Sequence, residues 1–451
     1  MPGKHKGLIL PIGAIFCCGA LSVVAQTPAY RSTWDDPAVV QRIEAGIQAN
    51  RMGWATLRVV DSNGKPLAGA KVAIEQTRHD FLFGANLFML GGFPTEAENR
   101  KFEQQFTGLF NFGTVPFYWK TLEPKPGQLR FASSSEPIFR RPPPDTAVEF
   151  SRRTGVTLKG HPLVWDNPTW QHPDWAPQDP ADLDRLMRQR IEQIAGRYRE
   201  TIPIWDVVNE VFQRNMKVPM PRDFVYRAFQ TAARVFPADT KLTLNEANNA
   251  WINFADEHSP FYLLIQNLLL RGAAVNTVGL QAHFWYSDIY EPRSLVMRPL
   301  DLLRVLDRYS DFRLPIHITE ITVPTPPGST GGEAAQAEIT RNLYRLWFSH
   351  PSVEAITWWN LVDNTAVPGE DKWLGGLLHR DLSPKLSYEA LRKLIQEEWH
   401  TKLERNATEQ GELRFQGFYG KYRGTVQYEG KTRVFEFSVS KGGINRAELR
   451  L

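Results

Sequence analysis

The hydrophobic positions between about residues 81 and 400 follow two alternating periods. Short strand-like apolar segments alternate with longer ones in which apolar residues recur every three or four positions. Strands are predicted at 81–85, 112–116, 157–161, 204–209, 241–245, 277–283, 316–320 and 355–360. Helices are predicted between them, for example at 183–198, 224–236, 261–270 and 334–348. Eight strands alternating with helices favour a closed parallel (β/α)8 barrel over an open sheet.

The segments on either side of this region have the period of two that is typical of strands. Early strands are predicted at 56–60 and 70–74, joined by a turn that contains Asn63-Gly64. After a predicted linker at 401–411, later strands are expected at 413–418, 422–428, 431–438 and 447–451. Because each module is too small to hold a core alone, we predict that both ends form one β-sandwich. Separate packing of the two on the barrel is the alternative.

The first 26 residues have the features of a signal peptide. Residues 4–6 are basic, residues 8–24 are largely apolar, and Ala25 stands at the expected cleavage point. No second apolar span of about 18 residues follows, so no membrane association is expected after cleavage. Both cysteines, Cys17 and Cys18, lie inside this segment, so no disulfide and no thiolate chemistry are expected. The predicted location is secreted or periplasmic.

The predicted organisation therefore has four parts. They are a signal peptide (1–26), an N-terminal helix with a small β-module (27–80), the catalytic barrel (81–400) and a C-terminal β-module (401–451). The 53 basic and 49 acidic residues are interspersed, which does not favour nucleic-acid binding. A monomer is expected. The count of 14 tryptophans is high, and some of them are expected to line a sugar cleft, although core packing explains any single one equally well.

Polar and aromatic residues gather where the predicted barrel strands end, which is where active sites form in such barrels. These residues are His161 and Trp165 after strand three, Asn209 and Glu210 after strand four, residues 245–248 after strand five, Gln281 and His283 at strand six, Glu320 at strand seven, and Trp358, Trp359 and Asn360 at strand eight. The set predicts one polar site with aromatic walls.

Glu210 and Glu320 are the candidate catalytic residues. They are separated by 110 positions, which corresponds to three βα units, and strands four and seven face each other across a barrel mouth. Glycosidic bond cleavage needs an acid for the leaving oxygen and a carboxylate for the anomeric centre. We assign Glu210 as acid/base and Glu320 as nucleophile, with about 5 Å between the two carboxyl groups. A single glutamate would be read as a solvated residue, but the combination of motifs favours catalysis.

The neighbouring residues fit these roles. Asn209 is expected to hydrogen-bond the sugar 2-hydroxyl, and His283 to hold Glu320 ionised and oriented. The negative charge on Glu320 should raise the pKa of Glu210, which keeps it protonated near neutrality. The predicted substrate-binding set is Lys120, His161, Trp165, Asn209, Gln281, His283 and Trp359, with Trp359 as an apolar floor. For His161 and His283 the alternative is a buried structural role, and for Lys120 it is an ion pair.

No metal or cofactor site is predicted. The histidines at these strand ends come from different strands and lack close ligand spacing, and no phosphate-binding glycine loop stands out.

The motifs resemble glycoside hydrolase family 10, the retaining endo-β-1,4-xylanases. The matching segments are Gly160-His161-x-Leu163-Val164-Trp165, Trp205-Asp206-Val207-Val208-Asn209-Glu210, Gly279-Leu280-Gln281-x-His283, Ile318-Thr319-Glu320, Trp358-Trp359, Gly376-Leu377-Leu378 and Ser383-Pro384-Lys385 with Tyr388. The resemblance covers about residues 81–400. It implies a (β/α)8 barrel, retention of configuration by double displacement, and no cofactor.

The sequence departs from the family pattern next to the cleaved sugar. Before Lys120 the family usually has a Glu-Asn pair that binds the next sugar outward, and here residues 116–119 are Pro-Phe-Tyr-Trp. Asp166 and Ala247 stand where a His and a Tyr are usual, and residues 363–368 lack the common Trp and Arg. The neighbouring pocket is predicted to be more aromatic and less polar, which changes substrate preference more than the reaction.

Three functions are open at this point. The first is a retaining endo-β-1,4-xylanase acting on xylan. The second, suggested by Phe117 and Trp119, is a retaining β-glycosidase acting on another plant or microbial glycan or on a glycoside with an apolar aglycone. The third is a non-catalytic carbohydrate-binding protein, which the complete set of site residues disfavours. The terminal β-modules are expected to brace the barrel, and glycan binding is their alternative role.

Overall fold

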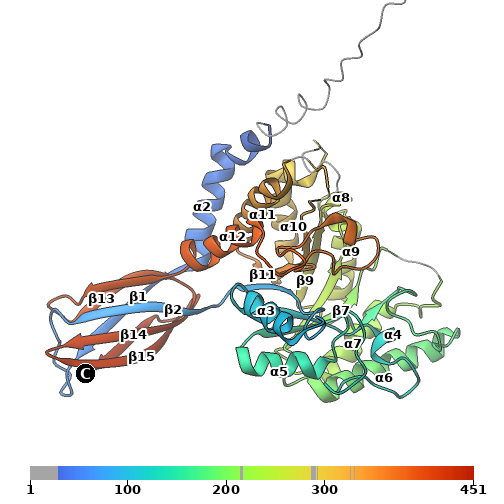
Figure 1. Cartoon of the computed structure of the whole chain (residues 1–451), viewed down its shortest axis with the longest axis horizontal. Coiled ribbons are helices and arrows are strands. Elements are labelled where there is room, and N and C mark those ends of the chain that lie inside the picture. The colour runs from blue at the N-terminus through green and yellow to red at the C-terminus, as the bar shows by residue number, and fades with distance from the viewer. Residues whose placement is uncertain (1–28, 214–216, 286–290, 292, 326, 330) are drawn as a thin grey trace, which may run out of the picture.

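The computed structural model describes residues 29–213, 217–285, 291, 293–325, 327–329 and 331–451. The predicted signal peptide lies outside these residues. Figure 1 shows a barrel with surrounding helices and, to one side, a β-sandwich that contains the C-terminus. Among the described residues, no helix is both long enough and apolar enough to cross a lipid bilayer.

Nine parallel strands form the barrel. They are β3 (Leu82–Asn86), β4 (Phe112–Pro116), β5 (Thr157–His161), β6 (Val164–Trp165), β7 (Ile204–Asn209), β8 (Lys241–Glu246), β9 (Thr277–His283), β10 (Ile316–Thr322) and β11 (Val353–Trp358). Strand β11 pairs with β3, and both β5 and β6 pair with β7, which closes the sheet. Because β5 and β6 share the third position, the architecture is the predicted eight-stranded (β/α)8 barrel.

Helices surround the barrel in the order that the sequence predicts. They are α3 (Glu96–Thr107), α4 (Trp119–Leu122), α5 (Pro144–Thr154), α6 (Pro180–Tyr198), α7 (Phe224–Val235), α8 (Asn249–Ile252), α9 (Pro260–Leu270), α10 (Pro299–Tyr309), α11 (Gly332–Ser349) and α12 (Leu386–Lys393). Helix α6 shows why they form. Asp179 caps it by accepting from two backbone N–H groups, and residues at helical spacing, such as Leu183, Met187 and Ile191, are buried.

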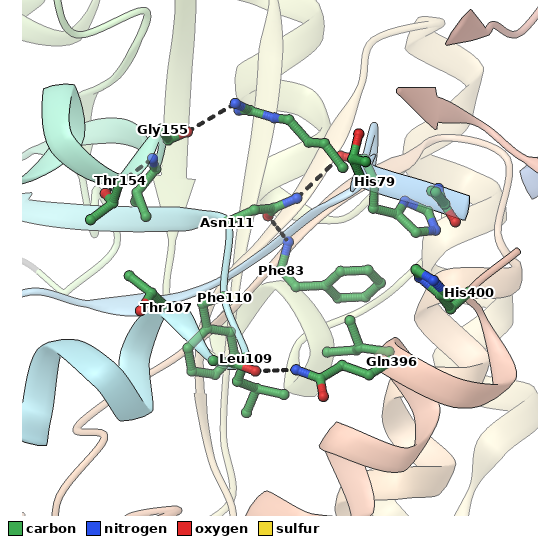
Figure 2. A pocket seen from close by; sticks show the side chains of 16 residues that line it. His79, Phe83, Thr107, Leu109, Phe110, Asn111, Thr154, Gly155, Gln396 and His400 are labelled. Atoms are coloured by element: carbon green, nitrogen blue, oxygen red, sulfur yellow. Dashed lines mark hydrogen bonds between the residues drawn. The ribbon is translucent and has the colours of Figure 1, made fainter. Parts of the chain in front are cut away.

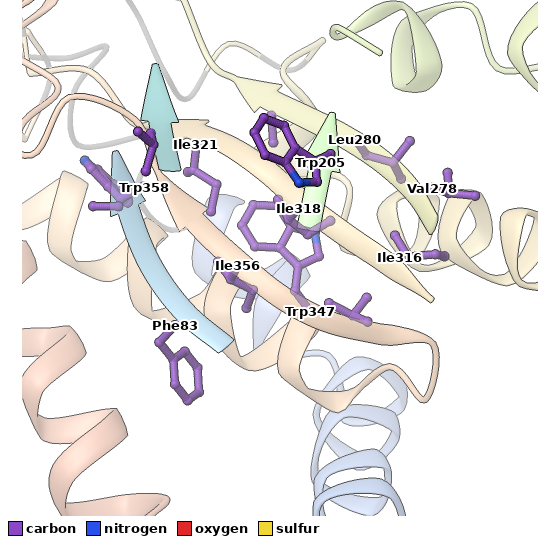
Figure 3. Packing of buried hydrophobic residues seen from close by; sticks show 14 of the residues in the cluster. Phe83, Trp205, Val278, Leu280, Ile316, Ile318, Ile321, Trp347, Ile356 and Trp358 are labelled. Carbon is purple, nitrogen blue, oxygen red and sulfur yellow. The ribbon is translucent and has the colours of Figure 1, made fainter. Parts of the chain in front are cut away.

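Large apolar side chains of the barrel strands pack against those of the surrounding helices, such as Trp347 of α11 (Figure 3). Every residue of β7 and β10 is buried, as expected for parallel strands that are covered on both faces. Trp205 is fully buried and lies against Gly160 of the neighbouring strand β5. A Cβ atom at position 160 would lie 2.1 Å from the indole ring, so this contact requires glycine.

The two ends of the chain form one sandwich, as predicted. One sheet contains β1 (Met52–Val60), β13 (Glu412–Phe418) and β16 (Arg446–Arg450). The other contains β2 (Lys71–His79), β12 (Lys402–Asn406), β14 (Gly420–Tyr428) and β15 (Lys431–Val439). Their facing sides share a core that includes Leu57, Val72, Phe415, Tyr422 and Val426.

The predicted linker at 401–411 is wrong over residues 402–406. This segment is strand β12, which pairs antiparallel with β2. It is an edge strand in which only Leu403 is half-buried and the other residues are exposed. The apolar alternation that identifies strands is therefore missing from its sequence. The four-part division of the chain stays a prediction.

Helix α2 (Pro37–Arg51) connects the sandwich to the barrel. It packs against α11, and its last residue, Arg51, is buried. The Arg51 guanidinium donates to the backbone carbonyl groups of Phe348, His350 and Val353, the last at 2.7 Å. Since β1 begins at the next residue, these bonds fix the base of the sandwich to the barrel.

A cavity of about 300 Å³ lies where the sandwich meets the barrel (Figure 2). Asn111 holds its wall together, because its side-chain amide donates to the carbonyl of Phe81 at 3.0 Å and accepts from the N–H of Phe83 at 2.9 Å. Burial lowers the pKa of His79 in this wall to about 3, so that the ring is neutral. None of the predicted site residues lines this cavity.

Candidate active site

A second cavity, of about 330 Å³, opens where the barrel strands end. It contains all but one of the predicted site residues: His161, Trp165, Asn209, Glu210, Gln281, His283, Glu320 and Trp359. The exception is Lys120, which does not line it. The remaining lining residues are Phe88, Tyr118, Arg140, Arg141, Trp170, Gln213, Ala247, Asn248, Trp285, Val367 and Glu370.

Glu210 follows β7 directly and has a left-handed backbone, with φ of 50°. Its N–H donates to the carbonyl of Asn245 at 2.9 Å, which holds this sparsely populated conformation in place. Its carboxyl Oε1 accepts from Nε2 of Gln281 at 3.0 Å. Burial, followed by the negative charge of Glu320, raises the pKa of Glu210 to about 7.

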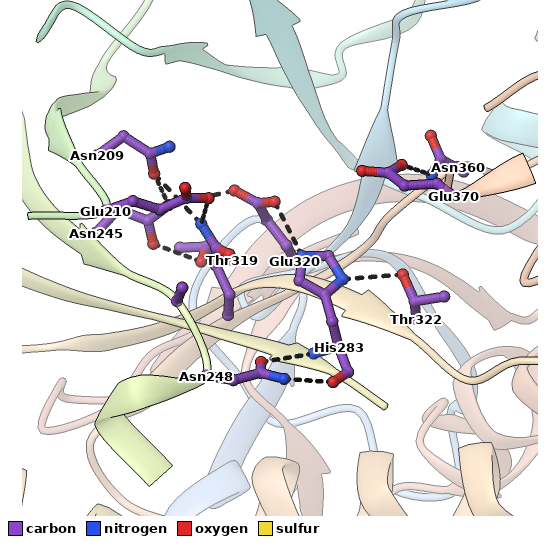
Figure 4. Close-up of polar contacts among 12 residues, drawn as sticks. Asn209, Glu210, Asn245, Asn248, His283, Thr319, Glu320, Thr322, Asn360 and Glu370 are labelled. Atoms are coloured by element: carbon purple, nitrogen blue, oxygen red, sulfur yellow. Dashed lines mark hydrogen bonds and ion pairs between the residues drawn. The ribbon is translucent and has the colours of Figure 1, made fainter. Parts of the chain in front are cut away.

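Glu320 lies in β10 with its carboxyl group turned toward that of Glu210 (Figure 4). Its Oε1 accepts from Nδ2 of Asn245 at 3.3 Å, and its Oε2 lies 3.2 Å from Nε2 of His283. Nε2 of His161 is 4.0 Å from Oε1. Burial raises the pKa of Glu320 to about 7, against the opposing influence of His161.

A buried charge network lies below Glu320. Asp206 Oδ2 is 2.8 Å from Nδ1 of His161 and 2.9 Å from Nζ of Lys159. Burial opposes ionisation of Asp206, but Lys159 and His161 outweigh it, so the pKa of this carboxyl is lowered. The network fixes the ring of His161, whose other nitrogen faces Glu320. It also compensates the charge of Lys159, which is completely buried in the barrel.

Amide side chains orient the two glutamates and Asn209. Oδ1 of Asn209 accepts from Nδ2 of Asn245 at 2.8 Å and from Nε2 of Gln281 at 3.3 Å. Oδ1 of Asn245 accepts in turn from the hydroxyl of Thr319 at 2.6 Å. Nδ2 of Asn209 is buried and has no acceptor in hydrogen-bond geometry among the described residues, although Asn209 lowers the pKa of the neighbouring Glu210 carboxyl. A donor in the cavity wall is thereby available to a ligand.

One side of the cavity combines aromatic rings with two arginines, and we call Phe88, Tyr118, Arg140, Arg141 and Trp170 the arginine wall. The guanidinium carbon of Arg141 lies 4.1 Å from the ring centroid of Tyr118, 5.3 Å from that of Phe88 and 5.7 Å from that of Trp170. Arg140 donates to the carbonyl of Thr365 and to Oδ1 of Asn360, at 2.5 and 2.6 Å.

The sequence matches the family model described as "Glycosyl hydrolase family 10" over residues 117–394, which is more than half of the chain. The chain belongs to glycosyl hydrolase family 10. This confirms the resemblance that the strand-end motifs indicate, and residues of the motifs that contain His161, Glu210, Gln281, Glu320 and Trp359 line one cavity.

Two relatives of this family-10 protein illustrate its distance from known proteins. It is 28% identical over 298 residues to endo-1,4-beta-xylanase B of Thermotoga neapolitana, covering 62% of this chain and 78% of the relative. It is 29% identical over 389 residues to anti-sigma-I factor RsgI6 of Acetivibrio thermocellus, covering 86% of this chain. The chain spans only 46% of the length of RsgI6.

A solved relative supports the fold. Xylanase 10B from Thermotoga petrophila RKU-1, in complex with xylobiose, superposes with a TM-score of 0.58 at 23% identity. The match covers 71% of this family-10 chain and 95% of the solved one. At this identity the likeness establishes the barrel fold.

Lys120 does not take the place predicted for it. Its Nζ pairs with the exposed carboxylate of Asp174 at 2.6 Å, outside the cavity. The backbone changes from extended at Tyr118 to helical at Trp119, so the side chains of Tyr118 and Lys120 point to different sides. Tyr118 therefore faces the cavity and Lys120 does not.

The aromatic character predicted for the neighbouring pocket also comes from other residues. Phe117 is buried against Tyr198 and Trp205, and Trp119 packs on Trp175, so neither lines the cavity. The pocket is aromatic through Tyr118, but it also carries two guanidinium groups. The expectation of a less polar pocket is wrong for this reason.

Sequence reasoning missed Arg140, Arg141 and Glu370. The arginines lie before α5, in a segment without helical or strand period, so no pattern placed them near a strand end. Arg140 has φ of 61°, which the sequence does not announce. One sequence feature could have indicated them. The two consecutive arginines are followed by three prolines at 142–144, which hold a loop rigid and can fix the position of charged side chains. Glu370 lies in the long segment after β11.

Proposed function

We propose that this family-10 protein is a retaining glycoside hydrolase that cleaves internal β-1,4 xylosidic bonds of xylan. The observation that carries the proposal is the pair of carboxyl groups of Glu210 and Glu320, turned toward each other in one cavity (Figure 4). Glu320 is the nucleophile and Glu210 the acid/base. The names of xylanase relatives support the substrate.

The surroundings of the two glutamates support this division of roles. Glu320 has hydrogen-bond partners on both oxygens, from Asn245 and His283. Glu210 is hydrogen-bonded to Gln281 through Oε1. Since hydrogen bonds to a carboxylate favour its charged form, Glu320 loses its proton first. Its charge then raises the pKa of Glu210, which remains a proton donor near neutral pH.

His283 orients the nucleophile as a neutral ring. Burial lowers its pKa, so it is uncharged near neutrality. A carboxylate only accepts, so the proton of the neutral ring lies on Nε2 toward Glu320, and Nδ1 accepts from the Thr322 hydroxyl 3.0 Å away. A neutral donor fixes the carboxylate without forming an ion pair that would weaken its nucleophilicity.

The reaction proceeds in two displacements. Glu320 attacks the anomeric carbon while Glu210 donates its proton to the departing glycosidic oxygen. In the second step Glu210, now ionised, removes a proton from water, and the water releases the sugar from Glu320 with its original configuration. Nδ2 of Asn209 donates to the sugar in the cavity, and Trp359, 5.5 Å from the ring of His161, forms the floor.

A second candidate is a retaining β-glycosidase that acts on a different glycan. The arginine wall favours it, because xylan backbone sugars carry no group that needs two guanidinium groups. We further propose an exported monomer that is secreted or periplasmic, supported by the composition of residues 1–26.

Hydrolysis of 4-nitrophenyl β-xylobioside and of xylan polymer tests the proposal. Proton NMR of the first product should show the β-anomer, and xylan should give a mixture of oligosaccharides. Release from the small glycoside without release from the polymer would favour the second candidate. Absence of turnover on all β-glycosides would remove both.

A further inference from the structure

Arg141 differs from the other buried arginines in how its guanidinium is satisfied. Arg51 and Arg130 each donate to three or more backbone acceptors. Arg190 donates to carbonyl groups in the barrel wall, such as Leu163 at 3.3 Å. Arg141 donates to a single acceptor among the described residues, the carbonyl of Arg140 at 2.9 Å. A guanidinium has five N–H donors, so most of its capacity is free in the cavity.

The charge of Arg141 is also poorly compensated. Neither Arg140 nor Arg141 lies in an ion pair with a carboxylate of the described part of the chain; the groups to which they donate are neutral. The negative charge of Glu370 raises the pKa of both guanidinium groups against the lowering effect of burial. The Glu370 carboxylate itself accepts a hydrogen bond from Nδ2 of Asn360 at 2.7 Å. Buried charges are normally paired, so Arg141 is suited to bind an anionic group of a ligand.

The arginine wall lies on the side of the nucleophile. Tyr118, which stacks with Arg141, is 5.6 Å from the ring of His161, and His161 faces Glu320. Burial and, to a smaller extent, the negative charge of Glu320 raise the pKa of the Tyr118 hydroxyl. In a double displacement the nucleophile holds the glycone and the acid faces the leaving group. The wall therefore faces the sugar on the glycone side of the cleaved bond.

We propose that the arginine wall binds the carboxylate of an acidic sugar, a uronic acid unit, next to the cleaved sugar on its glycone side. The planar fork of Arg141 matches a carboxylate in a bidentate arrangement. Tyr118 and Trp170 offer rings on which the apolar face of the same sugar stacks. This inference rests on the proposed glycosidase function and specifies its substrate class. Hydroxyl groups of a neutral sugar are the competing ligand.

Three chromogenic disaccharide substrates test the contribution of the sugar carboxylate to recognition. Each is a 4-nitrophenyl β-xyloside whose outer β-1,4-linked sugar is xylose, glucose or glucuronic acid, which differ only at the C5 substituent. The protein should hydrolyse the glucuronosyl compound with a kcat/KM about 10- to 100-fold above that of the glucosyl compound. This preference should weaken as salt is added.

Variants then assign the preference to Arg141. Arg141→Gln should make the glucuronosyl and glucosyl compounds equal, and Arg141→Lys should retain part of the difference, because it keeps the charge and loses the fork. Arg380→Gln is the matched control. Arg380 also stacks on a ring, 5.5 Å from that of Phe93, but lies outside the cavity, so its removal should leave the ratio unchanged.

Two results would overturn the inference. One is a wild-type protein that does not prefer the acidic compound, and the other is an Arg141→Gln variant that loses all three substrates equally, as expected of a hydroxyl ligand. If a folded wild type hydrolyses none of the three, the glycosidase proposal fails instead. Calorimetric binding of the same disaccharides to Glu320→Gln then decides the ligand class without turnover: acidic preference supports the inference and its absence refutes it.

Discussion

His283 places its Nε2 atom 3.2 Å from Oε2 of Glu320, while its Nδ1 atom is 3.0 Å from the hydroxyl of Thr322. The imidazole is therefore held between two residues of β10, and its position fixes the orientation of the Glu320 carboxylate. Because the ring is buried and uncharged, its contribution to Glu320 is a hydrogen bond and an orientation. This relationship makes the ionisation of Glu320 sensitive to one neutral donor.

Replacing that donor should shift the pH profile. In His283→Ala the carboxylate of Glu320 loses a hydrogen bond that favours its charged form, so its pKa should rise. The acidic limb of kcat/KM, which reports Glu320 in the free protein, should move to higher pH, and kcat should fall about 10- to 100-fold. Thr322→Val is the milder control, since it removes only the partner of Nδ1. A lower rate with an unmoved acidic limb would mean that His283 has only a structural role.

The two glutamates should respond differently to the leaving group. Glu320→Ala should abolish turnover of every substrate. Glu210→Ala should slow the hydrolysis of xylan, whose leaving group is a weakly acidic sugar hydroxyl, by about 100- to 10,000-fold. It should slow the hydrolysis of aryl glycosides with acidic phenol leaving groups much less. Steady-state rates on a series of substituted phenyl xylobiosides measure the difference. Equal losses across the series would contradict the acid role of Glu210.

The buried carboxyl of Glu210 should also cost stability at alkaline pH. Its folded pKa of about 7 is above its unfolded value of about 4.3, so the folded state holds the proton more tightly. The stabilising contribution is complete below pH 4.3 and is lost as the pH rises through 7. The Glu210→Gln side chain cannot ionise. The variant should therefore gain about 1–3 kcal/mol more unfolding free energy, relative to the wild type, at pH 8 than at pH 5. Denaturant unfolding at both pH values measures this, and an equal effect at both would refute it.

The barrel was predictable because its strands carry their own signals. The segments 112–116, 157–161, 204–209 and 277–283 form strands over the same residues, and in the last two an apolar run ends in polar residues at the barrel mouth. Closure then brings strands four and seven to one cavity, whatever the loops between them do. Glu210 and Glu320 could be paired from sequence for this reason.

The arginine wall was not predictable, because its residues depend on local backbone geometry. Whether Tyr118 or Lys120 faces the cavity depends on the start of α4, where the backbone changes from extended at Tyr118 to helical at Trp119. Arg140 reaches the cavity through a left-handed backbone conformation that its residue type does not favour. Strand β12 was missed because an edge strand with a solvated surface shows no alternation.

Asp206 should be critical for stability, because it is the anion that compensates Lys159 inside the barrel. Both side chains are fully buried, with 2.9 Å between Oδ2 and Nζ. Asp206→Asn leaves a buried cation without a partner, and the expected loss is about 3–5 kcal/mol in unfolding free energy. The double variant Asp206→Asn with Lys159→Met removes the unpaired charge and should recover part of the loss. Denaturant unfolding of the single and double variants measures both values. A double variant that is no more stable than Asp206→Asn would show that the Asp206 carboxylate stabilises the fold through His161, its other partner at 2.8 Å, and not through the lysine.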